Sequence, residues 1–203
     1  MRNPFEIVEW FEEAVAEYTG APYAIAVDSC TNAIFLTCIY RRIKFSDPVI
    51  TIPKRTYVSV PQSIMHAGAK VEFEDLDWEG IYQLKPSPIY DAAKRLTSNM
   101  YIPGTYMCLS FHHKKHLKIG KGGMILTDDE KAVEDIKKMR YEGRSQGIPY
   151  QEDKINSIGS NMYMTPEEAA RGLTLLIDHP TDCPDLIENP PYKDLTEFPL
   201  FKQ

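Results

Sequence analysis

The sequence predicts an α/β fold, and two features of its apolar pattern carry that prediction. Short apolar runs bounded by polar or turn residues are typical of buried strands, and they occur at residues 23–27, 47–53, 106–111 and 124–127. Segments with an apolar stripe at helical spacing follow two of these runs, at residues 34–43 and 128–143. The chain has 203 residues, 43% of them hydrophobic, which is enough to bury one sizeable core.

Composition excludes several classes of protein. The 23 lysines and arginines against 29 aspartates and glutamates give a net charge of −6, so we expect neither nucleic acid nor a membrane surface as a partner. The four cysteines show no metal-ligand spacing, and Cys38 and Cys108 lie in apolar contexts typical of core residues in a reducing compartment. The sequence has no run of about 18 apolar residues and no basic-then-apolar leader, so we expect a soluble, cytoplasmic protein.

The first predicted element is a helix that starts at Asn3. An N-cap Asn, Pro4 at the first helical position and Glu6 three residues after the cap form a typical start signal. Apolar residues then recur on one face until Gly20, which we expect to end the helix.

Residues 28–34 follow the first predicted strand and are rich in small polar side chains. A strand, such a turn and a helix N-terminus together favour an anion site, because free backbone N–H groups and the helix dipole converge there. The alternative interpretation is ordinary helix capping by Ser29 or Thr31.

Two later strands also end in polar side chains. One delivers the carboxylate of Asp91 to its carboxyl end, where α/β folds place ligand groups; the alternative is an Asp that caps a helix. The run at residues 106–111 delivers Ser110 and, five positions later, Lys115 to a turn with three histidines and four lysines. Ser110 could hold a phosphate and a desolvated Lys115 could act as a nucleophile, whereas the alternative is a surface loop with solvated lysines.

Taken in order, these segments resemble the DegT/StrS sugar aminotransferases, which are pyridoxal-phosphate (PLP) enzymes of fold type I. The matching family motifs are Ser-Gly-Thr-x-Ala-Leu at residues 29–34, Pro-x-x-Thr-aromatic at 53–57, Gly-Ala-x-x-x-Phe-x-Asp-x-Asp at 68–77, Glu-Asp-Ala-Ala-Gln/His at 90–94, Ser-Phe-His-x-x-Lys with Gly-x-Gly-Gly at 110–123, and Gly-x-Asn-x-Arg-Met-Thr at 159–165. The departures from the pattern include Cys30 in place of Gly, Lys94 in place of Gln or His, and Tyr163 in place of Arg.

The resemblance implies how the reactive end and the ring of PLP are held. By position, Lys115 forms the Schiff base with the cofactor and later moves a proton between the cofactor and the substrate α-carbon. Asp91 pairs with the protonated pyridine nitrogen, Tyr57 stacks on the ring, and Lys94 contacts the ring hydroxyl. A tyrosine such as Tyr57 is otherwise a core residue.

The resemblance also implies the phosphate ligands. Thr31, Asn32 and Ser110 hold the phosphate of the chain's own cofactor, and Asn161 reaches the phosphate in the neighbouring subunit of a homodimer with shared active sites. The alternative for Asn161 is that it orders a loop ahead of a helix capped by Thr165.

The fold implied by the resemblance has three α/β/α layers and a mainly parallel sheet, similar to PLP transferases of fold type I but shortened. Only 14 positions lead from Asp77 to Asp91, whereas a βαβ unit needs about 30 residues, so we expect at least one such unit to be missing. We expect residues 1–145 to form the shortened PLP-binding large domain and residues 146–203 a remnant of the C-terminal small domain.

The implied activity is transfer of an amino group from an amino acid, expected to be glutamate, to a nucleotide-linked keto-sugar. A second hypothesis is a truncated relative that binds PLP or a sugar nucleotide without turnover, or that partners a full-length aminotransferase. A phosphate-binding-loop NTPase, suggested by the glycines and lysine of residues 120–123, is excluded because the sequence lacks G-x-x-x-x-G-K-[ST].

Overall fold

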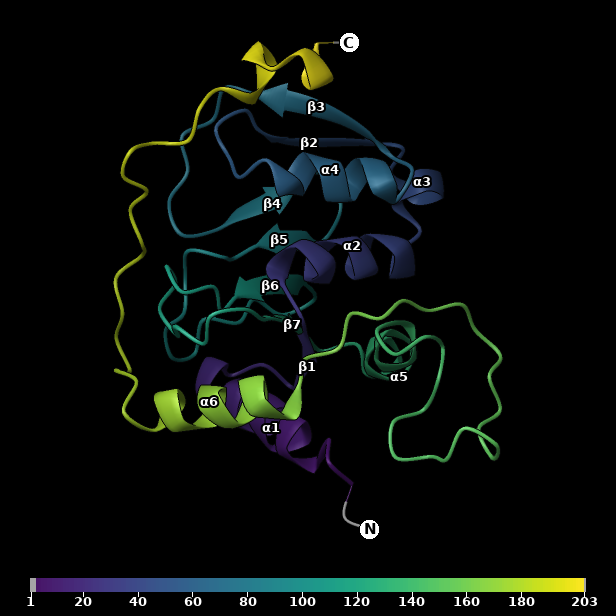
Figure 1. The fold of residues 1–203 in the computed structure, drawn as a ribbon. Helices are drawn as coiled ribbons and strands as arrows, with labels where there is room; N and C mark the ends of the chain where they lie inside the picture. Colours follow the sequence, from purple (N-terminus) through teal and green to yellow (C-terminus); the bar gives the residue numbers. More distant parts are fainter. Residues whose placement is uncertain (1–2, 203) are drawn as a thin grey trace.

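The computed structural model describes residues 3–202, which form a sheet covered by helices on both faces (Figure 1). The main sheet has five strands in the order β1-β7-β6-β5-β4, and a two-stranded sheet, β2-β3, lies beside β4. The strands are β1 (Tyr23–Val27), β2 (Val49–Pro53), β3 (Lys70–Glu74), β4 (Tyr82–Leu84), β5 (Ile89–Asp91), β6 (Tyr106–Ser110) and β7 (Gly123–Thr127). The prediction of an α/β fold is confirmed.

The sheet is mixed. β5 pairs with β6 and β2 pairs with β3 in parallel, whereas β1 with β7, β7 with β6 and β4 with β5 pair antiparallel. Backbone hydrogen bonds in both directions between Thr51 and Lys85, of 2.9 and 3.1 Å, join the two-stranded sheet to the end of β4.

The antiparallel pairing of β4 with β5 reflects the missing unit that the sequence predicts. Between Glu74 and Tyr106 the described chain contains the strands β4 and β5 and no helix. Only residues 85–88 connect the two strands, and a connection this short joins antiparallel neighbours, whereas parallel neighbours need a crossover of a dozen or more residues.

Within residues 3–202, six helices form the two outer layers. α2 (Cys30–Tyr40), α3 (Ile43–Ser46), α4 (Ser59–His66) and α5 (Glu130–Met139) lie over one face, and α1 (Glu6–Thr19) and α6 (Pro166–Ile177) over the other (Figure 1). Two 3-10 turns, η1 (Leu195–Glu197) and η2 (Pro199–Phe201), complete the described chain. Among residues 3–202, none of the helices is both long and apolar enough to cross a membrane.

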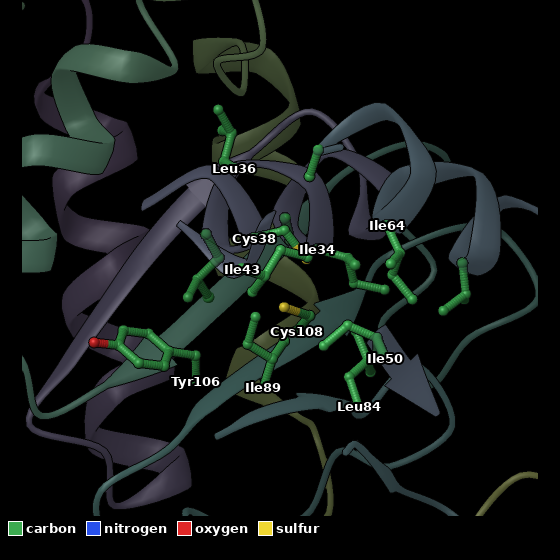
Figure 2. Close-up of a cluster of buried hydrophobic side chains, with 14 of the residues drawn as sticks. Ile34, Leu36, Cys38, Ile43, Ile50, Ile64, Leu84, Ile89, Tyr106 and Cys108 are labelled. Carbon is green, nitrogen blue, oxygen red and sulfur yellow. The ribbon is translucent and has the colours of Figure 1, made fainter. Parts of the chain in front are cut away.

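Alternate residues of the central strands fill two separate cores. Ile25 of β1 and Cys108 of β6 pack under α2, α4 and α5, in the cluster shown in Figure 2. Their neighbours Ala26 and Leu109 pack under α1 and α6. This alternation follows from the two-residue period of a strand and makes the domain three-layered.

Capping interactions explain where α1 begins and ends and where α6 begins. α1 begins at Glu6, later than predicted, because Asn3 caps a preceding turn: its Oδ1 accepts a hydrogen bond of 3.1 Å from the Phe5 N–H. Gly20 ends the helix as predicted, with a left-handed φ of 72°. α6 starts with a capping box in which Thr165 and Glu168 each accept a backbone hydrogen bond from the other residue.

A buried ion pair ties α1 to β1 and to the end of α5. Arg140 is 0% exposed, and its guanidinium donates to Glu12 and to the carbonyl oxygen of Ala26. The Glu12 carboxylate also accepts from the Ala26 N–H at 2.9 Å and pairs with Lys137 at 2.6 Å. Because these charges are shielded from water, each depends on its partner.

We therefore expect Arg140→Leu to lower the free energy of unfolding by about 3–5 kcal/mol, since it leaves the Glu12 carboxylate buried without its main partner. Urea denaturation at pH 7 measures the loss. The matched control is Lys131→Ala, which removes an exposed pair with Asp135 within α5 and should lower the free energy of unfolding far less. Equal losses in the two variants would contradict the role given to Arg140.

Candidate functional site

A cavity of about 510 Å³ lies where β5 and β6 end and α2 begins. Its wall includes six of the residues singled out from the sequence, namely Thr31, Tyr57, Asp91, Lys94, Ser110 and Lys115. Asn32 and Asn161 do not line it. The carboxyl ends of strands and a helix N-terminus therefore converge on one hollow, as expected for a ligand site in an α/β fold.

Asp91 is the buried acid of this cavity. It ends β5, is 4% exposed, and accepts hydrogen bonds of 2.9 Å from the Tyr82 hydroxyl and from the Ala93 N–H. Burial raises the pKa of Asp91, against the opposing effect of these two hydrogen bonds and of the nearby charges of Lys115 and Lys94. The described chain forms no helix between Asp91 and β6, so Asp91 is not a helix cap.

Tyr82 is a site residue that the sequence pattern missed. It lies directly opposite Asp91 in the antiparallel β4–β5 pair, and its hydroxyl also lies 2.6 Å from that of Thr56. The chain of hydrogen bonds from Thr56 through Tyr82 fixes the orientation of the Asp91 carboxylate. Only the register of two strands shows this pairing, and a tyrosine in a short apolar run gives no sign of it.

The N-terminus of α2 forms the second wall. Ser29, not Thr31, caps the helix, because the Ser29 hydroxyl accepts the Asn32 N–H at 3.2 Å. The Thr31 hydroxyl lies 2.8 Å from that of Ser59 and lines the cavity. The Asn32 side chain instead donates to the Asp28 carboxylate at 2.7 Å.

A glycine lets β7 approach this helix end closely. A Cβ built on Gly123 would lie 2.4 Å from the carbonyl carbon of Ser29, a distance that no side chain tolerates. Gly122 pairs with Ser29 and has a φ of 134°, in the region that favours glycine. The glycines after the lysine-rich turn thus bring that turn beside the helix N-terminus.

The turn after β6 supplies the amines. Ser110, Lys114, Lys115 and Lys121 all line the cavity, and the backbone of Lys115 is fixed by a hydrogen bond of 2.8 Å from its N–H to the His112 carbonyl. Lys115 is only partly buried, and its charge acts on Asp91 across the cavity. The turn is therefore part of a site wall and more than a solvated surface loop.

Lys94 and Tyr57 complete the wall of the cavity. Lys94 is a buried lysine, and Tyr57 is an exposed tyrosine. The Lys94 ammonium lies 4.5 Å from the centre of the Trp78 ring and 4.7 Å from that of Tyr192. Lys94 is 8% exposed, and burial lowers its pKa, partly offset by the charge of Glu188. Tyr57 is 56% exposed, so it is a cavity residue rather than a core residue.

Asn161 lies on a segment outside the cavity. Its amide donates to the Glu142 carboxylate at 2.6 Å, and its backbone pairs with Tyr141. Tyr163, where the family pattern has Arg, packs edge-on against Phe5 and Tyr141. Within the chain, Asn161 therefore orders a loop before α6.

Comparison with known proteins gives a consistent result. The chain matches the DegT/DnrJ/EryC1/StrS aminotransferase family over residues 2–101 and 102–179. It is 28% identical to the spore coat polysaccharide biosynthesis protein SpsC of Bacillus subtilis, covering 82% of this chain and 55% of the relative. It is 23% identical to a UDP-4-amino-4,6-dideoxy-N-acetyl-beta-L-altrosamine transaminase of Campylobacter jejuni, covering 96% and 63%.

Solved structures share the fold. PseC of Helicobacter pylori, an aminotransferase involved in the biosynthesis of pseudoaminic acid, superposes with a TM-score of 0.68 at 19% identity, over 88% of this chain and 63% of that chain. AtS13 of Actinomadura melliaura superposes with a TM-score of 0.71 at 19% identity, over 85% and 60%. The chain thus spans between 55% and 63% of the length of these relatives.

The raised pKa of Asp91 predicts that this carboxylate destabilises the fold at neutral pH. A carboxyl whose folded pKa lies above its unfolded value binds its proton more tightly in the folded state, so the protein loses stability as the pH rises from about 4 through the folded pKa. Asp91→Asn should therefore melt at a higher temperature than the parent at pH 7, and the difference should vanish near pH 3. Thermal melts of cofactor-free protein across this pH range measure both values.

Asp129→Asn is the matched control, with the opposite sign. Burial alone would raise the pKa of Asp129, but hydrogen bonds from the hydroxyls of Tyr106 and Tyr40 outweigh it and lower the pKa. That variant should melt below the parent at pH 7, with a difference that shrinks as the pH falls below about 4. A difference in melting temperature between Asp91→Asn and the parent that does not vary with pH would contradict the raised pKa of Asp91.

Proposed function

The chain belongs to the DegT/DnrJ/EryC1/StrS aminotransferase family, and from that premise we propose that it is a PLP-dependent sugar aminotransferase. It would transfer an amino group from an amino acid, glutamate in our proposal, to a nucleotide-linked keto-sugar. The observation that carries the proposal is the meeting of a buried carboxylate, Asp91, with the amine of Lys115 and the N-terminus of α2 around one cavity.

The cavity suits the chemistry of PLP. Its wall carries four lysines against two carboxylates, so it attracts an anionic ligand. The first N–H groups of α2 and the hydroxyls of Thr31 and Ser110 are suitable ligands for a phosphate. A protonated ring nitrogen placed against Asp91 would give this buried carboxylate the positive partner that it needs to remain ionised.

In the proposed reaction each residue has a separate task. Bound PLP supplies an electron sink for the substrate α-carbon. Asp91 accepts the ring N–H, and the Tyr82 hydroxyl keeps its carboxylate oriented by donating to it. Lys115 would hold the cofactor through Nζ, and its free amine would take the proton from the α-carbon of the amino donor. The Tyr57 ring packs against the cofactor ring.

A second function is favoured by one observation, the absence of a helix between β3 and β6 in the described chain. A chain that lacks a crossover unit at this place could bind PLP or a sugar nucleotide without turnover, or act as the partner of a full-length aminotransferase. This hypothesis differs from the first in one measurable respect, the reaction with an amino donor.

Reduction of the PLP-loaded protein with borohydride should attach the pyridoxyl group to Lys115, as located by peptide mapping. Added glutamate should then convert the cofactor to its amine form, which absorbance follows. Lys115→Ala should slow this conversion by at least about 100-fold, because it removes the proton-transfer group. Lys118→Ala, which alters an exposed lysine of the same turn that does not line the cavity, should react like the parent.

The outcomes separate the two functions. Attachment at Lys115 without any conversion by glutamate would favour the non-catalytic binder. Attachment of the pyridoxyl group at Lys114, or at neither lysine in protein saturated with PLP, would contradict the role of Lys115 as the lysine that holds the cofactor.

We further propose a twofold-symmetric homodimer with shared sites. Asn161 is exposed and lies outside the cavity of its own chain, which suits a residue that serves the partner's site. The proposal places Asn161 in the second of the two predicted regions, residues 146–203, and this division at residue 145 remains a prediction.

Complementation tests the shared site. Lys115→Ala and Asn161→Ala homodimers should each be impaired, whereas mixed and reannealed subunits should regain roughly a quarter of the parent reactivity with glutamate. The reason is that half of randomly paired dimers are heterodimers, and each heterodimer has one intact site of two. A monomer by light scattering, or verified heterodimers without any gain, would rule out sharing.

A further inference from the structure

The segment of residues 181–195, here called the cover segment, runs from the end of α6 to η1 along one edge of the molecule (Figure 1). It supplies Leu186, Glu188 and Tyr192, among other residues, to the wall of the cavity. The sequence suggests only a proline-rich polar stretch at this position. The structure instead places it against the candidate site.

Hydrogen bonds and ion pairs fix the cover segment at both ends. At its start, the Thr181 carbonyl accepts the Ser98 N–H at 3.0 Å, and the Leu186 N–H donates to the Lys94 carbonyl at 2.9 Å. At its end, the N–H of Leu195 donates to the carbonyl of Lys54 at 2.9 Å, and the Lys54 ammonium pairs with Asp194 at 2.9 Å.

Near its start, the cover segment also packs closely against the loop before β4. Arg95 and Asp185 form a two-pronged ion pair, and a Cβ built on Gly80 would lie 2.1 Å from a carboxylate oxygen of Asp185. The loop before β4 can approach the cover segment this closely only because residue 80 is a glycine, with a φ of 64°.

Between these anchors, one aromatic ring contacts the cavity wall. The Tyr192 ring lies nearly parallel to that of Trp78, at 13° with centres 6.4 Å apart, and the Lys94 ammonium lies within 4.7 Å of both ring centres. Two ring faces on one ammonium form a cation–π cage, which is strongest where water is excluded.

The cage is continuous with the Asp91 site. The Trp78 indole N–H donates to the Arg55 carbonyl at 2.9 Å, and its ring packs edge-on against Tyr82 with centres 4.6 Å apart. Tyr82 in turn donates to Asp91. The Lys94 cage therefore packs directly against Tyr82, the residue that supports Asp91.

We propose that Tyr192 is a positioning residue: with Trp78 it holds the Lys94 ammonium in the wall of the cavity, and so couples the cover segment to the binding of PLP. The coupling to PLP rests on the proposed function, whereas the cage itself does not. The charged groups that face Lys94 are Asp91 on β5, Lys115 on the turn after β6, and Glu188 on the cover segment. Lys94 adds a fixed positive charge that favours an anionic ligand in the cavity.

Trace acetylation of the cofactor-free protein tests the cage. The ratio of Lys94 to Lys131 labelling should rise by at least about 5-fold in Tyr192→Leu, the factor expected when one cation–π contact is lost and Lys94 becomes accessible. Tyr192→Phe keeps the ring but loses the hydroxyl that hydrogen-bonds to Glu188, and its labelling ratio should stay well below that of Tyr192→Leu. Phe198→Leu, beyond the cover segment, is the control for a changed aromatic residue nearby. Unchanged Lys94 labelling in Tyr192→Leu would overturn the cage.

A double-mutant cycle tests the coupling. Tyr192→Leu should weaken PLP binding about 5-fold in a spectroscopic titration, and it should add nothing in a Lys94→Met background, because it acts through Lys94. Equal weakening in both backgrounds would overturn the positioning role. If the parent chain binds no PLP, the proposed function and the coupling both fail, and the labelling ratio still decides whether the cage holds Lys94.

Discussion

A carboxylate kept out of water is the constraint on which the site depends. Asp91 is the last residue of β5 and is 4% exposed. Ionisation of its carboxylate at this buried position costs free energy, which other interactions of the fold offset. The hydrogen bonds from Tyr82 and Ala93 lessen this cost without removing it. A buried carboxylate in this condition favours a cationic ligand.

The short hairpin between β4 and β5 creates that condition. Because a few residues join the two strands, they pair antiparallel, and the register sets Tyr82 directly across from Asp91. A full crossover unit would add a parallel neighbour and a covering helix at the same place. Here the cover segment, residues 181–195, lies beside the hairpin and the loop before it, so a stretch distant in sequence completes the wall.

The two cores support the site from both faces of the sheet. β6 sends Cys108 into one core and Leu109 into the other, so its last residue, Ser110, is delivered to the cavity by a strand buried on both sides. The Arg140–Glu12 pair holds the end of α5 to α1 and β1. The two cores thus support the strands that end at the cavity, and the segments that carry Lys94 and Lys115 follow those strands.

The sequence by itself determined several of the elements and the residues that lie at their ends, but it indicated neither α4 nor β4. Asp91, Ser110 and the α2 N-terminus were predictable because hydrophobic period, strand ends and helix starts are local properties of the chain. Lys115 and Tyr57 followed from the resemblance to a family, and both line the cavity.

Only the tertiary structure decided the partners of these residues. The strand register pairs Tyr82 with Asp91, and the Asn32 side chain hydrogen-bonds to Asp28. Asn161 lies outside the cavity. The Lys94 ammonium contacts the rings of Trp78 and Tyr192. Trp78 and Tyr192 lie more than a hundred positions apart along the chain, and no periodicity connects them. Side-chain direction and contact depend on how elements pack, and packing is a property of the whole chain rather than of any window of its sequence.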